Sequence, residues 1–180
     1  MARRRRPHTD RSVAGPIHSA AVVRIQPVDD RAKRLWESAL ALADELPDQG
    51  WVLVGGLMVQ LHALRHGQGR IRPTVDIDIL ADSRQRPRSL TELVAERLIR
   101  LGYEAGEPTG LIGTPTLFTF ERDGARVDVL GPDGLKTPPR TIEKHETIPV
   151  PGGTQALQRT ETGTDQAVRA RAAYKLLTAP

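Results

Sequence analysis

The stretch Val75-Asp76-Ile77-Asp78-Ile79-Leu80-Ala81 alternates apolar and acidic side chains, and this alternation decides how the fold is interpreted. Residues at positions i and i+2 of a strand share one face. We therefore expect a strand at 75–81 with Asp76 and Asp78 side by side on one face. The residues expected to point into the core on the other face are Val75, Ile77 and Ile79.

Apolar periodicity predicts further helices and strands on both sides of this strand. The expected helices run from Asp29 or Asp30 to Pro47, from Gly56 to Gly67, from Ser89 to Gly102 and over 165–177. The expected strands span 51–54, 116–121, 125–130 and 147–150. The pair Asp123-Gly124 predicts a hairpin turn, and Ser89 with Glu92 predicts a capping box. This order of elements predicts an α/β (α+β) fold, with a small mixed sheet flanked by helices.

The composition limits the class of protein. The chain has 180 residues, which is enough for one domain of about 100 to 200 residues with tails. The absence of cysteine excludes a disulfide scaffold, a thiolate zinc site and a cysteine nucleophile. No apolar run approaches the ~18 residues that a membrane-spanning helix needs, and the N-terminus lacks the apolar stretch of a secretion signal. We therefore expect a soluble, cytoplasmic protein with no membrane partner.

The positive charge is concentrated near the N-terminus. Residues 1–34 contain nine basic and three acidic side chains, a net charge of +6, so the total of +4 leaves −2 for the rest of the chain. We expect a basic, disordered arm at 1–28, a folded domain at 29–160 and a short, truncated helix at 161–180. The run Arg3 to Arg6 suits contact with nucleic-acid phosphates. The alternative is a solvated leader with no role in binding.

A third carboxylate extends the acidic pair. Asp128 lies between Val127 and Val129, so its side chain faces away from theirs in a strand. If that strand pairs with 75–81, three carboxylates converge, as in sites that hold two divalent cations. Such a site binds magnesium or manganese in preference to zinc, and its third carboxylate can accept a proton. The alternative is a set of solvated aspartates on exposed strand faces.

A glycine pair joins the strand at 51–54 to the next helix. Gly55 and Gly56 would leave free backbone N–H groups at a helix N-terminus, where phosphate oxygens can bind. The full Rossmann pattern fails because Leu57 and Gln60 occupy its later glycine positions, and the phosphate-loop pattern is absent. The alternative is a turn that needs glycine only for its backbone.

These motifs together resemble a known family. Val54-Gly55-Gly56, the run from Arg72 to Leu80 and Val127-Asp128-Val129 are similar to the nucleotidyltransferases of the DNA polymerase beta superfamily. Within that superfamily they most resemble the AbiEii-type branch, where the toxin of a type IV toxin–antitoxin pair is found. The resemblance covers about residues 35–160.

The resemblance implies a role for each motif. Gly55 and Gly56 would cradle the triphosphate of an NTP. Asp76 and Asp78 would hold Mg²⁺ or Mn²⁺, and Asp128 would complete the site and activate the acceptor hydroxyl. The implied activity is transfer of an NMP from an NTP to a hydroxyl of RNA, such as tRNA, or of a protein.

Two basic residues are implied to assist. Arg72 would balance phosphate charge, and its alternative is a solvated loop residue. Relatives of this branch continue into a helical C-terminal part with a lysine that contacts phosphate, and Lys175 is the candidate here. The chain would then be a toxin-like enzyme with an antitoxin protein as partner. The alternative function is a catalytically inactive module of the same fold that binds a nucleotide or a protein.

Overall fold

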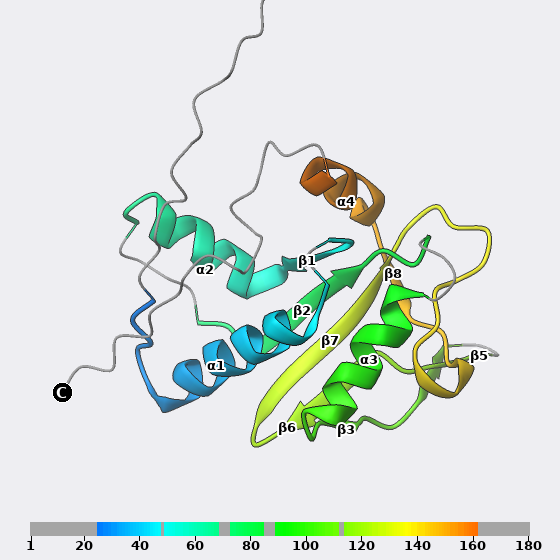
Figure 1. Ribbon diagram of the computed structural model, residues 1–180, viewed down its shortest axis with the longest axis horizontal. Coiled ribbons are helices and arrows are strands. Elements are labelled where there is room, and N and C mark those ends of the chain that lie inside the picture. The colour runs from blue at the N-terminus through cyan, green and yellow to red at the C-terminus, as the bar shows by residue number, and fades with distance from the viewer. Residues whose placement is uncertain (1–24, 48, 69–72, 85–88, 112–113, 162–180) are drawn as a thin grey trace, which may run out of the picture.

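The computed structural model describes residues 25–47, 49–68, 73–84, 89–111 and 114–161, which form a mixed α/β fold (Figure 1). The helices are α1 (Asp30–Glu45), α2 (Gly55–Arg65), α3 (Leu90–Arg100), the 3-10 turn η1 (Ile142–Lys144) and α4 (Gly153–Glu161). The strands of the main sheet are β1 (Trp51–Val54), β2 (Asp76–Ala81), β3 (Glu104–Ala105), β6 (Thr119–Arg122), β7 (Ala125–Pro132) and β8 (Ile148–Val150). A separate pair is formed by β4 (Thr109–Leu111) and β5 (Thr114–Thr116).

The main sheet is built around β7. Its strand order is β1-β2-β7-β6-β3, and β8 pairs with the far end of β7. The β2 and β7 strands run parallel, with Asp78 opposite Asp128, whereas β1 and β6 run antiparallel to their neighbours. The pairing between the two aspartate-bearing strands, which was the condition for the convergence of the three carboxylates, is therefore present. Because both strands alternate in the same register, their side chains divide into two matched faces.

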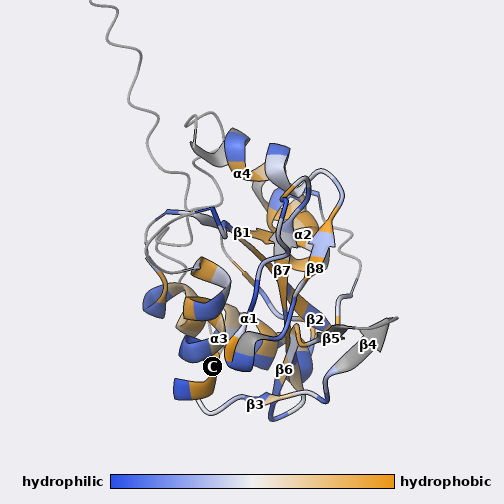
Figure 2. Ribbon diagram, turned by 90° about the vertical axis from the view of Figure 1, so that its right-hand side faces the viewer, coloured by the Kyte–Doolittle hydropathy of each residue, from blue (hydrophilic) through white to orange (hydrophobic). Residues whose placement is uncertain are grey.

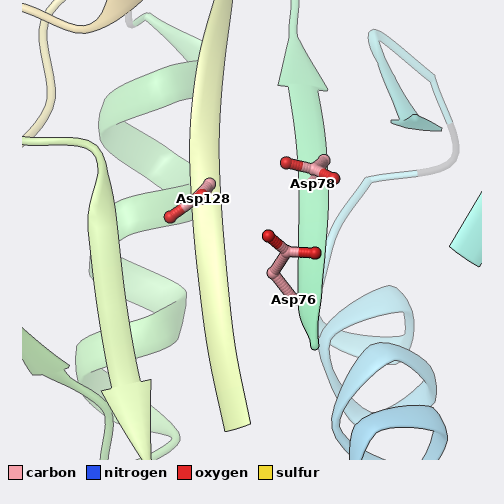
Figure 3. Close-up of side chains that lie close together, drawn as sticks. All are labelled: Asp76, Asp78 and Asp128. Atoms are coloured by element: carbon pink, nitrogen blue, oxygen red, sulfur yellow. The ribbon is translucent and has the colours of Figure 1, made fainter. Parts of the chain in front are cut away.

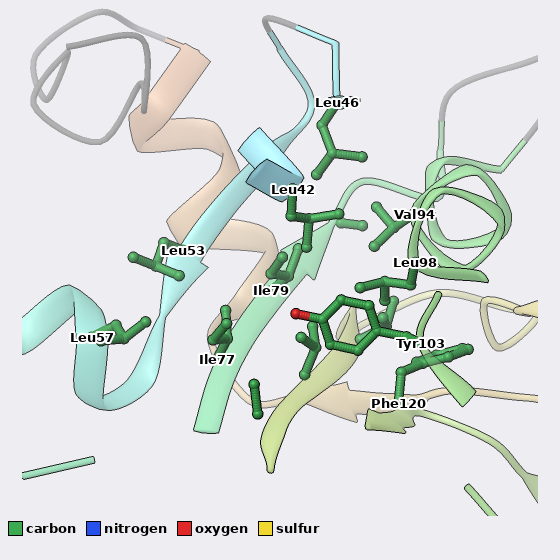
Figure 4. Close-up of a cluster of buried hydrophobic side chains, with 14 of the residues drawn as sticks. Leu42, Leu46, Leu53, Leu57, Ile77, Ile79, Val94, Leu98, Tyr103 and Phe120 are labelled. Carbon is green, nitrogen blue, oxygen red and sulfur yellow. The ribbon is translucent and has the colours of Figure 1, made fainter. Parts of the chain in front are cut away.

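One face of β2 and β7, which we call the core face, carries Ile77, Ile79, Val127 and Val129. Helices α1 and α3 lie side by side across it (Figure 1) and contribute apolar side chains (Figure 4). The helix residues in this core include Leu35, Trp36, Leu42, Val94 and Leu98. Figure 2 shows both helices alternating between apolar and polar residues, as expected for helices with one buried side.

The other face, which we call the acidic face, is covered at one end by α4. It carries Asp76, Asp78 and Leu80 on β2, and Arg126, Asp128 and Leu130 on β7. Leu157 of α4 packs there against Leu80 and Val52. The acidic face is therefore apolar where α4 lies and polar where the two strands begin.

The structure confirms several elements expected from the sequence. The Asp29 side chain caps α1 by accepting a hydrogen bond of 2.7 Å from the Ala32 amide. Asp123 and Gly124 form the predicted turn between β6 and β7, with φ angles of 51° and 78°. Both φ angles are positive, as the tight hairpin turn requires.

Other expectations were wrong in detail. Val75 is 49% exposed because it precedes the first paired residue of β2. Ser89 starts α3 without a side-chain hydrogen bond to the helix backbone, because its hydroxyl contacts that of Thr91 at 2.6 Å. Ile25, expected in the arm, is buried in the core, so packing begins earlier than residue 29.

The C-terminal half departs most from the expectations. Helix α4 was not predicted, because it follows a stretch rich in proline and glycine. The helix expected at 165–177 and most of the arm lie outside the described residues. Among the described helices, none is long and apolar enough to cross a membrane.

Candidate metal centre

Three aspartates meet at the open end of the acidic face (Figure 3). Asp76 and Asp78 come from β2, and Asp128 comes from β7. One carboxylate oxygen from each lies within 4.8 Å of the others. The parallel register places Asp78 directly opposite Asp128, and the alternation of β2 brings Asp76 to the same face. The structure thus brings together the three acidic residues that the sequence predicted.

The three carboxylates differ in their hydrogen-bond partners. Asp76 accepts a bond of 2.9 Å from the Thr74 hydroxyl. Asp128 leans toward β6, where it accepts a bond of 2.8 Å from the Thr119 hydroxyl, and it also binds the guanidinium of Arg126. Within the described part of the chain, no donor forms a hydrogen bond to Asp78. The described residues therefore provide hydrogen-bond donors to two of the three carboxylates.

The surroundings of Asp78 shift the pKa of its carboxyl group. Burial and then the charges of Asp76 and Asp128 raise its pKa from 3.8 to about 6, and Arg126 acts in the opposite direction. The ionised form is therefore held at a free-energy cost at neutral pH. A cation that bound between the carboxylates would remove that cost.

The glycine turn at the start of α2 forms one wall of this centre. Gly55 has a φ of 63°, and a Cβ atom at this position would overlap the Oδ2 atom of Asp78. A Cβ atom at Gly56 would overlap the hydroxyl of Thr74. The N-cap residue of α2, Val54, makes no side-chain capping hydrogen bond. Glycine is needed at both positions because the Asp78 carboxylate and the Thr74 hydroxyl occupy the space that a Cβ atom would take. Phosphate binding by this turn stays a prediction.

The donor set fits a hard divalent cation. All three candidate ligands supply carboxylate oxygen, which suits Mg²⁺ and Mn²⁺ better than zinc. With three aspartates at −1 and Arg126 at +1, the formal charge of the group is −2, which one divalent cation balances. A second cation would require further negative charge, such as the phosphates of a nucleotide.

Three polar residues of the site were not predicted from the sequence. Thr74 and Arg126 each precede a site aspartate by two positions, and Thr119 lies opposite Asp128 on β6. The period of two that identified the aspartates also places Thr74 and Arg126 beside them, so this signal was available. The predicted phosphate contacts Arg72 and Lys175 lie outside the described residues.

Comparisons of the chain with protein-family models, with curated proteins and with solved structures found no match in any of the three.

Proposed function

We propose that this protein is a metal-dependent nucleotidyltransferase that moves an NMP from an NTP to a hydroxyl acceptor. The observation that carries the proposal is the convergence of Asp76, Asp78 and Asp128 at the glycine turn that opens α2. Three carboxylates beside a helix N-terminus combine a cation site with a phosphate site. The resemblance of the motifs to the DNA polymerase beta superfamily supplies the type of reaction.

Each part of the site has a role in this proposal. Asp76, Asp78 and Asp128 would hold Mg²⁺ or Mn²⁺, which when bound supplies Lewis-acid stabilisation of phosphate charge. The amides of Gly55 and Gly56 would orient the triphosphate. Asp128 would accept the proton of the acceptor hydroxyl. The oxygen of that hydroxyl would form a bond to the α-phosphorus of the NTP. The bond from that phosphorus to the bridging oxygen breaks, and pyrophosphate leaves.

The acceptor and the setting belong to the same proposal. The acceptor is an RNA, such as tRNA, or a protein hydroxyl, and the reaction takes place in the cytoplasm, where NTPs are abundant. Arg72 and Lys175 are the proposed additional phosphate contacts. In the toxin-like version, a second protein neutralises the activity as an antitoxin. Growth arrest on expression, relieved by co-expression of a neighbouring gene, would support that version.

Nucleotidyl transfer is tested directly with α-labelled NTPs. The protein is incubated with each NTP, Mg²⁺, total tRNA and a protein extract, and the labelled products are separated. Asp76→Asn removes one site charge and keeps the side-chain shape, while Asp44→Asn makes the same change on the exposed side of α1. We expect labelling by the wild type and by Asp44→Asn, and none by Asp76→Asn. Equal labelling by all three proteins would contradict the proposal.

A second candidate function is favoured by one contact. Arg126 binds both oxygens of Asp128, the carboxylate assigned to the acceptor proton. A module that keeps this pair permanently would bind an NTP without transferring it. Ligand at 100 times its Kd raises the free energy of unfolding by about 2.7 kcal/mol if it binds only the folded state. A thermal shift with NTP and Mg²⁺ but no labelled product would therefore favour the binding module.

A further inference from the structure

The contact between Arg126 and Asp128 neutralises a nearly buried carboxylate. The Nε atom of Arg126 donates to Oδ1 of Asp128 at 3.0 Å, and its Nη2 atom donates to Oδ2 at 3.0 Å. The Asp128 side chain is 9% exposed, whereas that of Arg126 is 44% exposed. A bidentate pair of this kind fixes the plane of the carboxylate. The aspartate is thus held from the solvent side by a cation of the protein itself.

This contact leaves little room for a metal ion on Asp128. A carboxylate has about four lone-pair positions for hydrogen bonds. Arg126 uses two of them, and the Thr119 hydroxyl uses a third, on Oδ1. A divalent cation bound to Asp128 would also be repelled by a guanidinium that lies within hydrogen-bond distance of the same carboxylate. Full coordination by Asp128 therefore requires Arg126 to move away.

Arg126 also affects the other two aspartates. It lies opposite Asp76 in the parallel register, and its charge lowers the pKa of Asp78. Its other cross-strand neighbour is Glu121 of β6, which is exposed and pairs with it in the antiparallel register. Directly opposite residues share a face, so Glu121 lies within reach of a guanidinium that leaves Asp128.

We propose that Arg126 is the internal counter-ion of the metal centre, which holds Asp128 in the metal-free protein and turns to Glu121 when a divalent cation binds. This inference rests on the proposed function, because it takes the three aspartates as the cation site. It assigns Arg126 a positioning role: the residue keeps the aspartates together without metal and sets how strongly metal binds. The exposed Glu121 offers only a weak ion pair, so the exchange opposes metal binding.

The test is the affinity of the full chain for Mn²⁺ at pH 7.5, measured by calorimetry and by the loss of the free-ion electron paramagnetic resonance signal. If Arg126 competes with the metal, Arg126→Gln should bind Mn²⁺ about tenfold more tightly than the wild type. Arg100→Gln makes the same change of charge at the exposed end of α3 and should change the affinity less than twofold. Asp78→Asn should weaken Mn²⁺ binding both in the wild type and in Arg126→Gln.

Two outcomes would overturn the counter-ion role. If Arg126 only supports the fold of the site, Arg126→Gln would bind Mn²⁺ more weakly than the wild type, which is the opposite sign. If charge at a distance explained the effect, Arg100→Gln would match Arg126→Gln.

Arg126→Lys keeps the charge without the bidentate contact, so its affinity for Mn²⁺ should lie within about threefold of the wild type. Glu121→Gln, which removes the second position of the guanidinium, should weaken Mn²⁺ binding by about twofold.

The affinity data and the labelling assay separate the two proposals. If Arg126→Gln binds Mn²⁺ more tightly and the wild type gives no labelled product, the counter-ion role is supported and nucleotidyl transfer is contradicted. Labelled product with no gain in affinity for Arg126→Gln would support the transferase and contradict the counter-ion. Absence of Mn²⁺ binding by the wild type and by Arg126→Gln would contradict the counter-ion.

Discussion

The two faces of β2 and β7 have the same backbone and opposite roles. On the core face, Ile77, Ile79, Val127 and Val129 are buried in one apolar cluster with residues of α1 and α3. On the acidic face, α4 covers one end only, and carboxylates occupy the other. Burial of apolar surface stabilises the first face, whereas the second holds like charges together at a cost. The contrast indicates that burial of apolar side chains on the core face offsets the free-energy cost of the like charges on the acidic face.

The largest expected effect compares neighbours within β2. Ile77→Ala removes a completely buried side chain and should lower the free energy of unfolding by about 2–5 kcal/mol. Asp76→Asn, one position away on the acidic face, should change it by less than about 1 kcal/mol, because the side chain is half-buried and the substitution reduces charge repulsion. Urea denaturation measures both. A similar loss from both variants would break the distinction between the faces.

A smaller effect is expected where α2 meets the acidic face. Gly55→Ala places a methyl group on the Asp78 carboxylate, while Gly67→Ala has a similar positive φ and nothing within 4 Å of the new atom. Both variants carry the backbone cost of a left-handed alanine. We expect Gly55→Ala to lose about 2 kcal/mol more, by urea denaturation, and to lose Mn²⁺ binding. Equal losses would mean that the carboxylate moves aside freely.

The pH dependence of stability tests the charge on the acidic face. Asp78 has a pKa of about 6 in the folded protein, against 3.8 for an ordinary aspartate. The folded state therefore binds more protons between these values, and stability falls as the pH rises from about 4 to about 6. The expected fall from this half-buried group is about 1 kcal/mol, after allowance for solvent screening. Asp78→Asn should remove it in denaturation curves recorded from pH 4 to pH 8, and an unchanged profile would place the perturbed group elsewhere.

The smallest expected effect concerns the hydroxyl beside Asp76. Thr74→Val keeps the shape of the side chain and removes the hydrogen bond to the Asp76 carboxylate. We expect a loss of about 0.5 kcal/mol in thermal unfolding, because solvent can replace the lost donor. Asp44→Asn, on the exposed side of α1, provides the baseline for a substitution outside the site. A loss larger than that of Gly55→Ala would show that Asp76 depends on Thr74 for its position.

The sequence predicted the parts of the structure that follow from short-range patterns. Alternation predicted β2 and the phase of Asp76, Asp78 and Asp128, and Asp123-Gly124 predicted the hairpin. These features depend on side-chain period and turn chemistry, which a few neighbouring residues determine. The pairing of β2 with β7 was a conditional expectation, because no local signal identifies a partner strand.

The remaining features depend on contacts between distant segments. Helix α4 is held by apolar contact with Leu80 and Val52, and by Asp133, which accepts bonds from the Gly152 and Thr154 amides. Neither contact is visible in the sequence around the helix. The exposure of Val75 similarly depends on where pairing with β7 begins. The period of two places Arg126 beside Asp128, but only the folded structure shows that its guanidinium binds Asp128 rather than Asp76 or Glu121.

The parallel pairing of β2 with β7 has a consequence for how the chain folds. Asp78 and Asp128 are partners in the register, yet the segment between them contains α3 and the hairpin of β6 and β7. Closing so long a loop costs chain entropy before any contact across it is gained. Until β7 has paired with β2, only two of the three carboxylates, those of Asp76 and Asp78, lie on neighbouring strand positions. Divalent cations would therefore bind strongly only after β2 and β7 have paired, and would stabilise that pairing.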